Sequence, residues 1–554
     1  MVRRVPFLLA VLFFVAAEGM AGAGPLEPPA PGEKWTTLRV DEFTLISNVP
    51  QAETTAIARD VLRMRRAIGE ITKLKMREVA PTRIFVFASE RDFAPYRKVL
   101  LDRLSETTQG AYITSDGGNF IIMKRDDADR VDRTVYHELT HYFFENTTGN
   151  LPLWLSEGLA EYYSTFETSG DSVLVGRLIV EHVTWLRNQT LIPLRELLAT
   201  TVDSPAYNEG MRKGVFYAQS WALVHYLLEN ETRSAQLGRF VRLLREDTPV
   251  DEAFVSAFGK SYGEVEVELR AYVAKQRFTY ARHPLTALSV PEPAKPEPLP
   301  RDALLFELGH LLAYGAVESP DHARLFLEEA LAANPSHAGA YADLGRMHHT
   351  AGRRREADAA LTRAVELGSD DPKVHLLVGL GALEHFKGVR EPAAPSEALL
   401  RARRALERSV ELDPGSAPAW TGVGATYIYT NEDPAPGIAA LEKSLALVPG
   451  DVNAAFNLVQ LYARAGRFAP AKWLIDTVLA RGATQEMTAF ARESLRVATT
   501  NASILKINEA IEKANAGRYA EASAILDAVF PELDDAEMLT RVSELRGMLA
   551  RMKK

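Results

Sequence analysis

The chain has 554 residues, of which 47% are hydrophobic and 25% charged, as expected for a globular protein with two or more domains. Its formal net charge of -9 at pH 7, without a basic stripe, argues against a protein that binds nucleic acid. The absence of cysteine excludes disulfides, thiolate zinc ligands and a lipid-modified cysteine.

The N-terminus has the pattern of a secretory signal. Arg3 and Arg4 precede an apolar run over residues 5–17, and an Ala-Gly-Ala cleavage site ends at Ala23. The apolar run is too short to cross a bilayer comfortably, and no later run is long enough. We therefore predict that residues 1–23 are a signal peptide and that the mature protein has no membrane span. An uncleaved anchor is the alternative. The expected location is a bacterial periplasm or the cell exterior.

Residues 24–40 begin with a stretch rich in proline and glycine and are expected to form a mobile leader. The first folded domain is expected to span residues 41–282. Its hydrophobic periodicity alternates between that of strands and that of helices. The predicted elements are strands at Phe43–Ile46 and Arg83–Ala88, helices at Glu53–Lys75, Glu90–Leu101 and Val173–Asn188, and a hairpin formed by Gly110–Thr114 and Asn119–Met123.

The stretch 135–164 contains the pattern His-Glu-x-x-His at His137, Glu138 and His141. Residues four apart lie on one face of a helix, so both imidazoles point at one position, as a tetrahedral zinc ion requires. Glu138 lies beside that position, where it can take a proton from water that zinc activates. The pattern alone is a modest signal, because two half-buried histidines on an amphipathic helix give the same sequence.

A second helix is expected over Trp154–Tyr162, which reads WLSEGLAEY, after a break at Gly149–Pro152. Ser156 is expected to cap this helix, and acidic residues near its start suit the helix dipole. A short turn and an antiparallel return would bring Glu157 back to the position that His141 faces.

The two motifs in this order resemble those of the gluzincin metallopeptidases, and within them the bacterial peptidase MA-like proteins. The resemblance covers approximately residues 38–282. It implies an α+β zincin-like metallopeptidase domain that binds Zn²⁺ through His137, His141 and Glu157. It also implies that Glu138 is the general base of peptide hydrolysis.

Two further roles follow from the same resemblance. Glu161, one turn beyond the glutamate ligand, would orient a ligand histidine. Tyr217, on the periodic stretch Lys213–Asn230, best matches a gluzincin tyrosine whose hydroxyl donates to the oxyanion. A core aromatic is the alternative for Tyr217, and Tyr207 and His225 are the reserve candidates.

The resemblance also bears on how substrate would bind. In the gluzincin layout an edge strand beside the metal binds extended substrate backbone, and Gly110–Thr114 or Asn119–Met123 is expected to be that edge. Gluzincin aminopeptidases hold the substrate's amine with the glutamate of a Gly-x-Met-Glu-Asn segment. The comparable stretch here, Gly110–Thr114, has no acid, which disfavours an exopeptidase.

Residues 283–300 contain six prolines and are expected to form an extended linker. Residues 301–554 then show repeats of about 34 residues, the period of tetratricopeptide (TPR) arrays. Each repeat is a helix pair that must stack on its neighbours, which predicts an all-α TPR solenoid with a groove for a partner protein. A spacer is the alternative. The first three repeats are marked by Leu308-Gly309, Leu344-Gly345 and Leu380-Gly381.

The sequence thus predicts an exported zinc endopeptidase whose repeats recruit a protein or peptide substrate or a partner protein. The alternative is a non-catalytic TPR scaffold or assembly factor with a structural or vestigial metal domain. A hydrolase of non-peptide amides, such as cell-wall links, would use the same chemistry.

Overall fold

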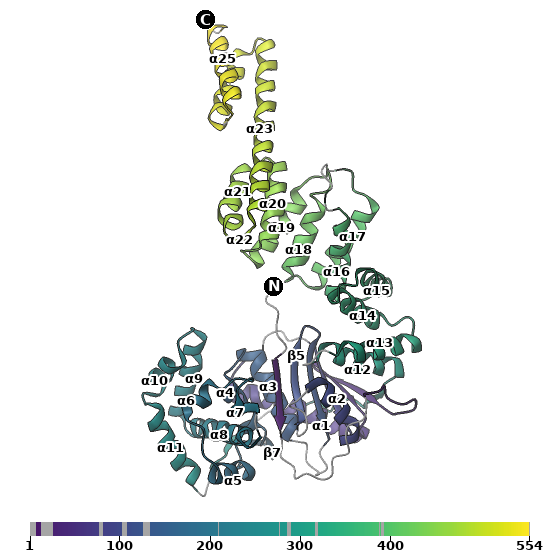
Figure 1. Ribbon diagram of the computed structural model, residues 1–554, viewed down its shortest axis with the longest axis vertical. Coiled ribbons are helices and arrows are strands. Elements are labelled where there is room, and N and C mark those ends of the chain that lie inside the picture. The colour runs from purple at the N-terminus through teal and green to yellow at the C-terminus, as the bar shows by residue number, and fades with distance from the viewer. Residues whose placement is uncertain are drawn as a thin grey trace. The chain divides into compact units, whose positions relative to one another are not determined.

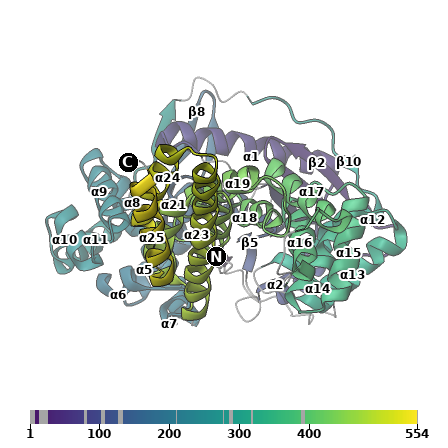
Figure 2. The same ribbon diagram turned by 90° about the horizontal axis from the view of Figure 1, so that it is seen from above.

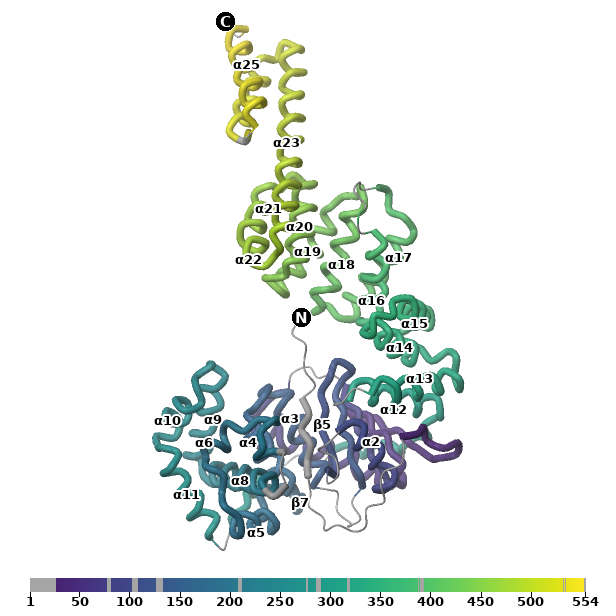
Figure 3. The backbone as a smooth tube through the Cα atoms, viewed as in Figure 1, coloured from purple at the N-terminus to yellow at the C-terminus, as the bar shows by residue number. Residues whose placement is uncertain are grey.

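The structure is a computed structural model of the chain (Figures 1 and 3). The chain divides into two compact units, residues 1–335 and 336–554. The structure describes residues 7–12, 26–76, 81–101, 108–125, 133–208, 210–275, 278–284, 290–315, 319–386, 388, 393–533 and 535–552.

The first unit is built on a mixed seven-stranded sheet with the order β1-β5-β6-β4-β3-β2-β10 (Figure 1). Strands β3, β4 and β6 are parallel, and the other neighbours pair antiparallel. The strands are β1 (Phe7–Leu12), β2 (Thr36–Val40), β3 (Phe43–Ser47), β4 (Thr82–Phe87), β5 (Thr108–Ser115), β6 (Gly118–Lys124) and β10 (Glu297–Pro298). A second sheet has three strands, β7 (Glu167–Ser169), β8 (Ser172–Val175) and β9 (Ala281–Pro284).

Helices complete this mixed α/β unit. Figures 1 and 2 agree in placing α9, α10 and α11 at one end of it and α12 and α13 at the opposite end. The helices are α1 (Gln51–Thr72), α2 (Glu90–Leu101), α3 (Arg133–Thr148), α4 (Leu153–Tyr163), α5 (Val180–Asn188), α6 (Leu194–Ala199), α7 (Pro205–Asn208), α8 (Gly210–Leu228), α9 (Glu231–Arg245), α10 (Val250–Phe258), α11 (Tyr262–Ala274), α12 (Arg301–Tyr314) and α13 (Pro320–Ala333).

The central strand β4 is buried on both faces. Ile84 and Val86 belong to the core that α1 and α3 complete. On the other face the Phe87 ring contacts Phe93 and Tyr96 of α2, at centroid distances of 5.6 and 4.9 Å. A parallel strand covered on both faces has a continuous run of apolar residues, and Ile84–Phe87 is such a run. The α3 helix lies on this core, and the sheet therefore fixes its position.

Several sequence predictions are confirmed. The hairpin is present, with β5 and β6 paired antiparallel, and α2 has the predicted bounds Glu90–Leu101. The predicted helix Val173–Asn188 is wrong in its first part, where β8 replaces it. Val173 and Val175 are β-branched and buried, and β8 pairs with β7 and β9. The helix α5 begins only at Val180.

The predicted leader and linker both contribute to the main sheet. Thr36–Val40, expected to be mobile, forms β2, and the neighbouring Trp35 is buried at 4% exposure. In the predicted linker, Glu297 pairs with Thr37 across β10 and β2. From Trp35 onward apolar and polar residues alternate as in a strand, but the alternation is weak. The prolines before Trp35 favoured an unstructured leader instead. These two segments are parts of the first unit rather than free connections.

The expected substrate edge also differs. β6 lies inside the sheet between β5 and β4, so Asn119–Met123 is not an edge. β5 pairs on its outer side with β1, which falls within the predicted signal peptide. The other residues of segment 1–23 and the predicted cleavage site lie outside the described residues. Removal of residues 1–23 would make β5 the edge of the sheet.

The first repeat pair, α12 and α13, belongs to the first compact unit, which ends at residue 335 rather than at the predicted start of the repeats, residue 301. The Arg83 guanidinium pairs with Glu307 at 2.6 Å, and His310 Nε2 lies 3.1 Å from the Gly117 carbonyl oxygen. The Leu100 side chain also packs closely against Gly315. This pair therefore packs on the sheet like a further layer of the α/β unit.

The second unit is all-helical. In Figure 3 the long helix α23 runs beyond α20, α21 and α22, and α25 lies along its far end. The helices are α14 (Ala338–Thr350), α15 (Arg354–Glu366), α16 (Pro372–Leu383), α17 (Glu397–Leu412), α18 (Ala417–Thr426), α19 (Ala435–Leu447), α20 (Val452–Arg464), α21 (Phe468–Leu474), α22 (Ala480–Gly482), α23 (Gln485–Asn515), α24 (Tyr519–Val529) and α25 (Ala536–Met552).

One contact recurs in the helix pairs. A glycine of the first helix faces a leucine of the second, so closely that an added Cβ would clash with the leucine side chain. The pairs are Gly309 with Leu327, Gly345 with Leu361, Gly379 with Leu406 and Gly424 with Leu441. The third repeat therefore uses Gly379, and the predicted Gly381 instead faces Asp358, with 3.3 Å from an added Cβ to Oδ1.

Within the described part of the chain, no helix is both long enough and apolar enough to cross a membrane.

Candidate metal centre

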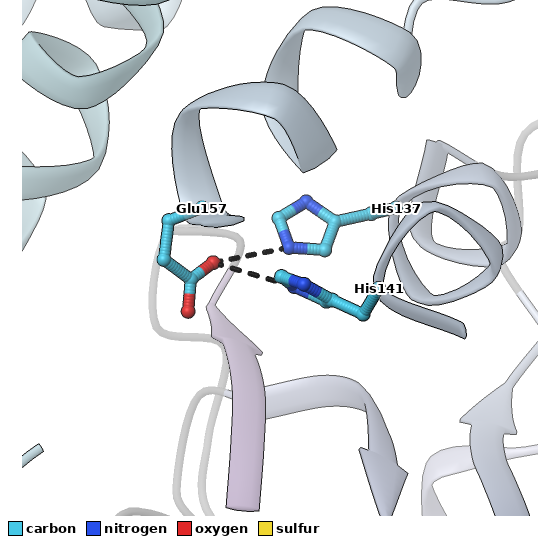
Figure 4. Close-up of side chains that lie close together, drawn as sticks. All are labelled: His137, His141 and Glu157. Carbon is cyan, nitrogen blue, oxygen red and sulfur yellow. Dashed lines mark hydrogen bonds and ion pairs between the residues drawn. The ribbon is translucent and has the colours of Figure 1, made fainter. Parts of the chain in front are cut away.

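Two consecutive helices carry the candidate ligands. α3 ends at Thr148, and the following residue, Gly149, has a φ of +77°, which is favourable for glycine and closes the helix. The chain turns through residues 149–152, and α4 returns toward α3. His137 and His141 have ring centroids 4.7 Å apart, and both rings point at the Glu157 carboxylate (Figure 4). The predicted break and return are thus present.

The three side chains are spaced as one metal ion requires. His137 Nε2 lies 3.2 Å and His141 Nε2 3.5 Å from the same oxygen, Glu157 Oε2. Ligands at about 2.0–2.1 Å from a tetrahedral zinc ion are about 3.3 Å apart. All three residues are buried, and one ligand atom of each lies within 4.8 Å of the others. His141 Nε2 has no hydrogen-bond partner among the described residues. The donor set therefore fits a divalent metal.

The other ring nitrogen of each histidine faces a polar side chain. His141 Nδ1 lies 3.0 Å from the Ser156 hydroxyl, and His137 Nδ1 lies 3.5 Å from Glu161 Oε1. Such contacts fix ring orientation and leave Nε2 for a metal. The predicted cap at Ser156 is wrong, because α4 begins at Leu153 after Pro152 and no side chain caps it.

Glu161 is the centre of a buried charge network. Arg133 Nη2 and His182 Nε2 each lie 3.0 Å from Glu161 Oε2. Burial alone would raise the pKa of Glu161, but His182, His137 and Arg133 outweigh it and hold the pKa well below its usual range. The carboxylate is therefore charged, and its placement behind His137 agrees with the expected orienting role.

Two tyrosines contact the other carboxylate oxygen of the candidate ligand Glu157. The hydroxyls of Tyr207 and Tyr217 each lie 3.4 Å from Glu157 Oε1, the oxygen that does not face the histidines. The two hydroxyls are 3.2 Å apart. Burial and the Glu157 charge raise the pKa of Tyr217 well above its usual value, so it remains a donor. Tyr217 thus lies at the site, and so does the reserve candidate Tyr207.

The second reserve candidate, His225, lies elsewhere. Its Nδ1 is 2.7 Å from the Tyr272 hydroxyl, and its Nε2 is 2.7 Å from the Gly176 carbonyl oxygen. With both nitrogens satisfied inside the core, His225 has a structural role.

Glu138 is fully buried on α3 and next to β5. Burial, and then the charge of Glu157, raise the pKa of Glu138 well above its usual value, while the Tyr112 backbone N–H opposes the shift. An added Cβ at Gly110 of β5 would lie only 3.5 Å from Glu138 Oε1. The Glu138 carboxyl group therefore lies between α3, which carries it, and β5. A side chain larger than that of glycine at position 110 would crowd it.

Gly158, which directly follows Glu157, lies where α4 packs against α8. An added Cβ would lie 2.5 Å from the Ser220 carbonyl oxygen and 2.6 Å from Val224 Cγ2, both on α8. Only glycine lets α4 and α8 approach this closely. The contact brings Tyr217 of α8 next to Glu157.

Sequence reasoning missed several residues of the site. Arg133 and Ser156 border the two motifs, so a search for partners of the ligand histidines and Glu161 could have proposed them. His182 and Lys213 come from separate helices, and nothing local in the sequence connects either residue to the motifs.

Comparison with known families gives a match in each part of the chain. Residues 71–275 match the profile of the Peptidase MA superfamily, and residues 316–380 match that of the tetratricopeptide repeat. No curated protein matches the chain.

Solved structures similar to the chain cover only part of it. YrrB, described as a TPR protein with an unusual peptide-binding site, is 18% identical over 34% of this chain and 91% of its own, with a TM-score of 0.29. MamA is 20% identical over 31% and 89%, with a TM-score of 0.24. Pseudomonas aeruginosa pilF is 19% identical over 37% and 91%, with a TM-score of 0.26. The two profile matches show that the chain combines a Peptidase MA superfamily domain with C-terminal TPR repeats.

Proposed function

We propose that the chain is a zinc-dependent endopeptidase with a zincin-like catalytic domain. The observation that carries this proposal is the convergence of His137, His141 and Glu157 at zinc-ligand spacing. Zinc bound there would polarise the scissile carbonyl. It would also lower the pKa of its bound water, so that the water is easily deprotonated and can attack the carbonyl carbon.

Glu138 is the proposed general base. It lies on the ligand helix directly after His137, fully buried, with its carboxyl group beside β5. It would accept a proton from the attacking water and return it to the leaving amine.

Tyr217 is the proposed donor to the oxyanion. Its hydroxyl and that of Tyr207 both contact Glu157 Oε1, so either one is close to where negative charge develops. Tyr217 is preferred because it lies on α8, which packs directly on the glutamate helix. Replacing each tyrosine in turn by phenylalanine distinguishes a donor to the transition state, which lowers kcat, from a structural contact to Glu157, which lowers zinc affinity.

The repeats are the proposed recruiting region, because TPR helix pairs expose surfaces that bind partner peptides and proteins. The signal-like N-terminus supports a role outside the cytoplasm, in a bacterial periplasm or beyond it.

The test is cleavage of casein by the purified chain, with zinc content measured in parallel. We expect cleavage that a chelator stops and added zinc restores, and no cleavage by Glu138→Gln. Zinc bound without cleavage of any protein substrate would instead support the alternative, an assembly factor with a structural metal.

A further inference from the structure

A cavity of about 500 Å³ lies beside the candidate metal centre. It is lined by α5 and α8 together with Arg133 and Glu161. Two lining residues belong to the network described above, since Tyr217 contacts the ligand Glu157 and Glu161 contacts His137. A cavity of this size can hold one or two substrate residues. Anything bound in it would lie next to the site of cleavage.

The charges in the cavity are unevenly satisfied. Arg133 and His182 both pair with Glu161, each at 3.0 Å, so these groups are accounted for. No hydrogen bond or ion pair joins the Lys213 ammonium to a described residue, although Lys213 is only 7% exposed. Its polar neighbour is the Tyr207 ring, whose centroid is 5.3 Å from Nζ.

A largely buried lysine without a hydrogen-bond acceptor is unfavourable, and an anion bound in the cavity would supply that acceptor. The Glu157 charge favours the cation, but Glu157 would share its charge with a bound metal. Burial lowers the pKa of Lys213 to about 8, against the opposing effect of the Glu157 charge, and an anion bound beside the ammonium would favour its charged form. The lysine is thus available to a negatively charged ligand.

The other residues that line the cavity indicate what the rest of the ligand is made of. Ile179 and Val180 contribute aliphatic surface, and Trp185 contributes an indole ring packed on Gly214. The cavity therefore offers an apolar wall, a polar part formed by Glu181, Thr184, Asn188 and Gln189, and the Lys213 cation on the wall formed by α8. A carboxylate carried on an aliphatic stem matches the apolar wall and the cation, whereas a basic side chain would meet Lys213 with like charge.

We propose that this cavity binds a substrate carboxylate close to the cleaved bond and that Lys213 is the residue that selects it. The carboxylate belongs either to an acidic side chain or to the substrate's own C-terminus, since both present the same group on a short stem. The inference rests on the proposed peptidase function and adds the substrate class of the same site.

The experiment starts with the zinc-loaded full chain and a mixed peptide library, with cleavage products identified by mass spectrometry. The best-cleaved peptide is then resynthesised with Glu or Asp replaced by Gln or Asn near the cleaved bond, and separately with its C-terminus amidated. We expect one of these changes to lower kcat/KM about tenfold or more, and the arm that responds identifies the source of the carboxylate.

Three variants make the test specific. Lys213→Met should remove the preference, leaving charged and neutral peptides within about twofold of each other. Lys213→Glu should shift the preference toward Lys or Arg at the same position. Lys260→Met is the matched control, because Lys260 is a lysine of the same unit whose side chain is 41% exposed and pairs with Glu268, and it should leave the preference unchanged.

The outcomes separate the possible explanations. If Lys213 only supports Glu157, Lys213→Met lowers zinc content and the cleavage of all peptides equally, which overturns the inference. An unchanged cleavage profile in Lys213→Met also overturns it, while the peptidase proposal stands. Zinc-loaded wild-type protein that cleaves no peptide overturns the peptidase proposal and this inference together.

Discussion

The metal centre and the repeat helices both depend on glycines at helix contacts, yet the two regions bury different chemistry. In the repeats each glycine lies closest to a leucine side chain, although a backbone atom of the second helix is 2.9–3.1 Å from the added Cβ of Gly345, Gly379 and Gly424, so the contact is mainly one of apolar volume. At the metal centre Gly158 admits the backbone of α8, and the contact brings tyrosines to a buried carboxylate. If a larger residue replaces a repeat glycine, the leucine side chain can move to make room. If one replaces Gly158, the Ser220 backbone cannot move without shifting α8.

The comparison teaches how each region can fail. A repeat loses stability in proportion to the volume that no longer fits. The metal centre can instead lose its function while remaining folded, because its residues hold charges in place for a ligand. The following predictions test this difference.

The largest expected effect comes from the proposed base. Glu138→Gln keeps the size of the side chain and removes its proton acceptor. We expect cleavage to fall by about 10²–10⁴-fold, with zinc still bound. Zinc content and casein cleavage measured on the same sample check this, and unchanged turnover would remove Glu138 from the mechanism.

The glycines test the comparison itself. Gly158→Ala places a Cβ against the Ser220 backbone, which cannot move without shifting α8, so we expect a loss of about 1–3 kcal/mol of unfolding free energy and weaker zinc binding. Gly345→Ala meets mainly the Leu361 side chain and should cost less stability and no zinc. Gly238→Ala is the control, since nothing lies within 4 Å of its added Cβ. Urea unfolding and zinc titration measure both effects, and equal zinc loss in the first two variants would contradict the account.

The network behind His137 should have a smaller effect. Glu161→Gln removes the charge that Arg133 and His182 share, so the imidazole of His137 is less well oriented. We expect zinc affinity to fall by about 10–100-fold with the fold intact. Competition with a chelator of known affinity measures this. Glu252→Gln, at an exposed position of α10, serves as the control and should bind zinc like the wild type.

The smallest effect is a pH dependence away from the metal. Burial lowers the pKa of His225, against the opposing effects of the Gly176 carbonyl oxygen and Glu229. The unfolded chain therefore binds more protons below about pH 6.5, and stability falls as the pH falls through that value. Comparing unfolding free energies at pH 7.5 and 5.5, we expect His225→Gln to lose about 1 kcal/mol less than the wild type. Equal losses would show that His225 does not titrate in this way.

The sequence predicted the parts of the site that lie on consecutive helices. The spacing of His137 and His141 on one turn and the break before α4 were sufficient to place Glu157 opposite them. The contacts from α5 and α8 could not be predicted, because a hydrophobic pattern says which face of a helix is buried but not what it packs against. His182 reaches Glu161 only through such packing.

For the fold, strong periodic signals were reliable and weak ones were not. The apolar run of β4 and the repeat period gave the correct structure. The prolines before Trp35 and in residues 283–300 suggested free segments, but short strands in both places pair with each other at the sheet margin. Edge pairing needs only a few backbone hydrogen bonds, and the side-chain pattern does not reveal it.

The most direct test of the central claim is the zinc content of the purified chain, measured by elemental analysis after dialysis, beside that of Glu157→Gln. The account predicts one tightly held zinc ion per wild-type chain and a large loss in the variant, because one of three converging ligands is gone. A wild-type chain that holds no zinc, or a variant that holds as much as the wild type, would contradict it.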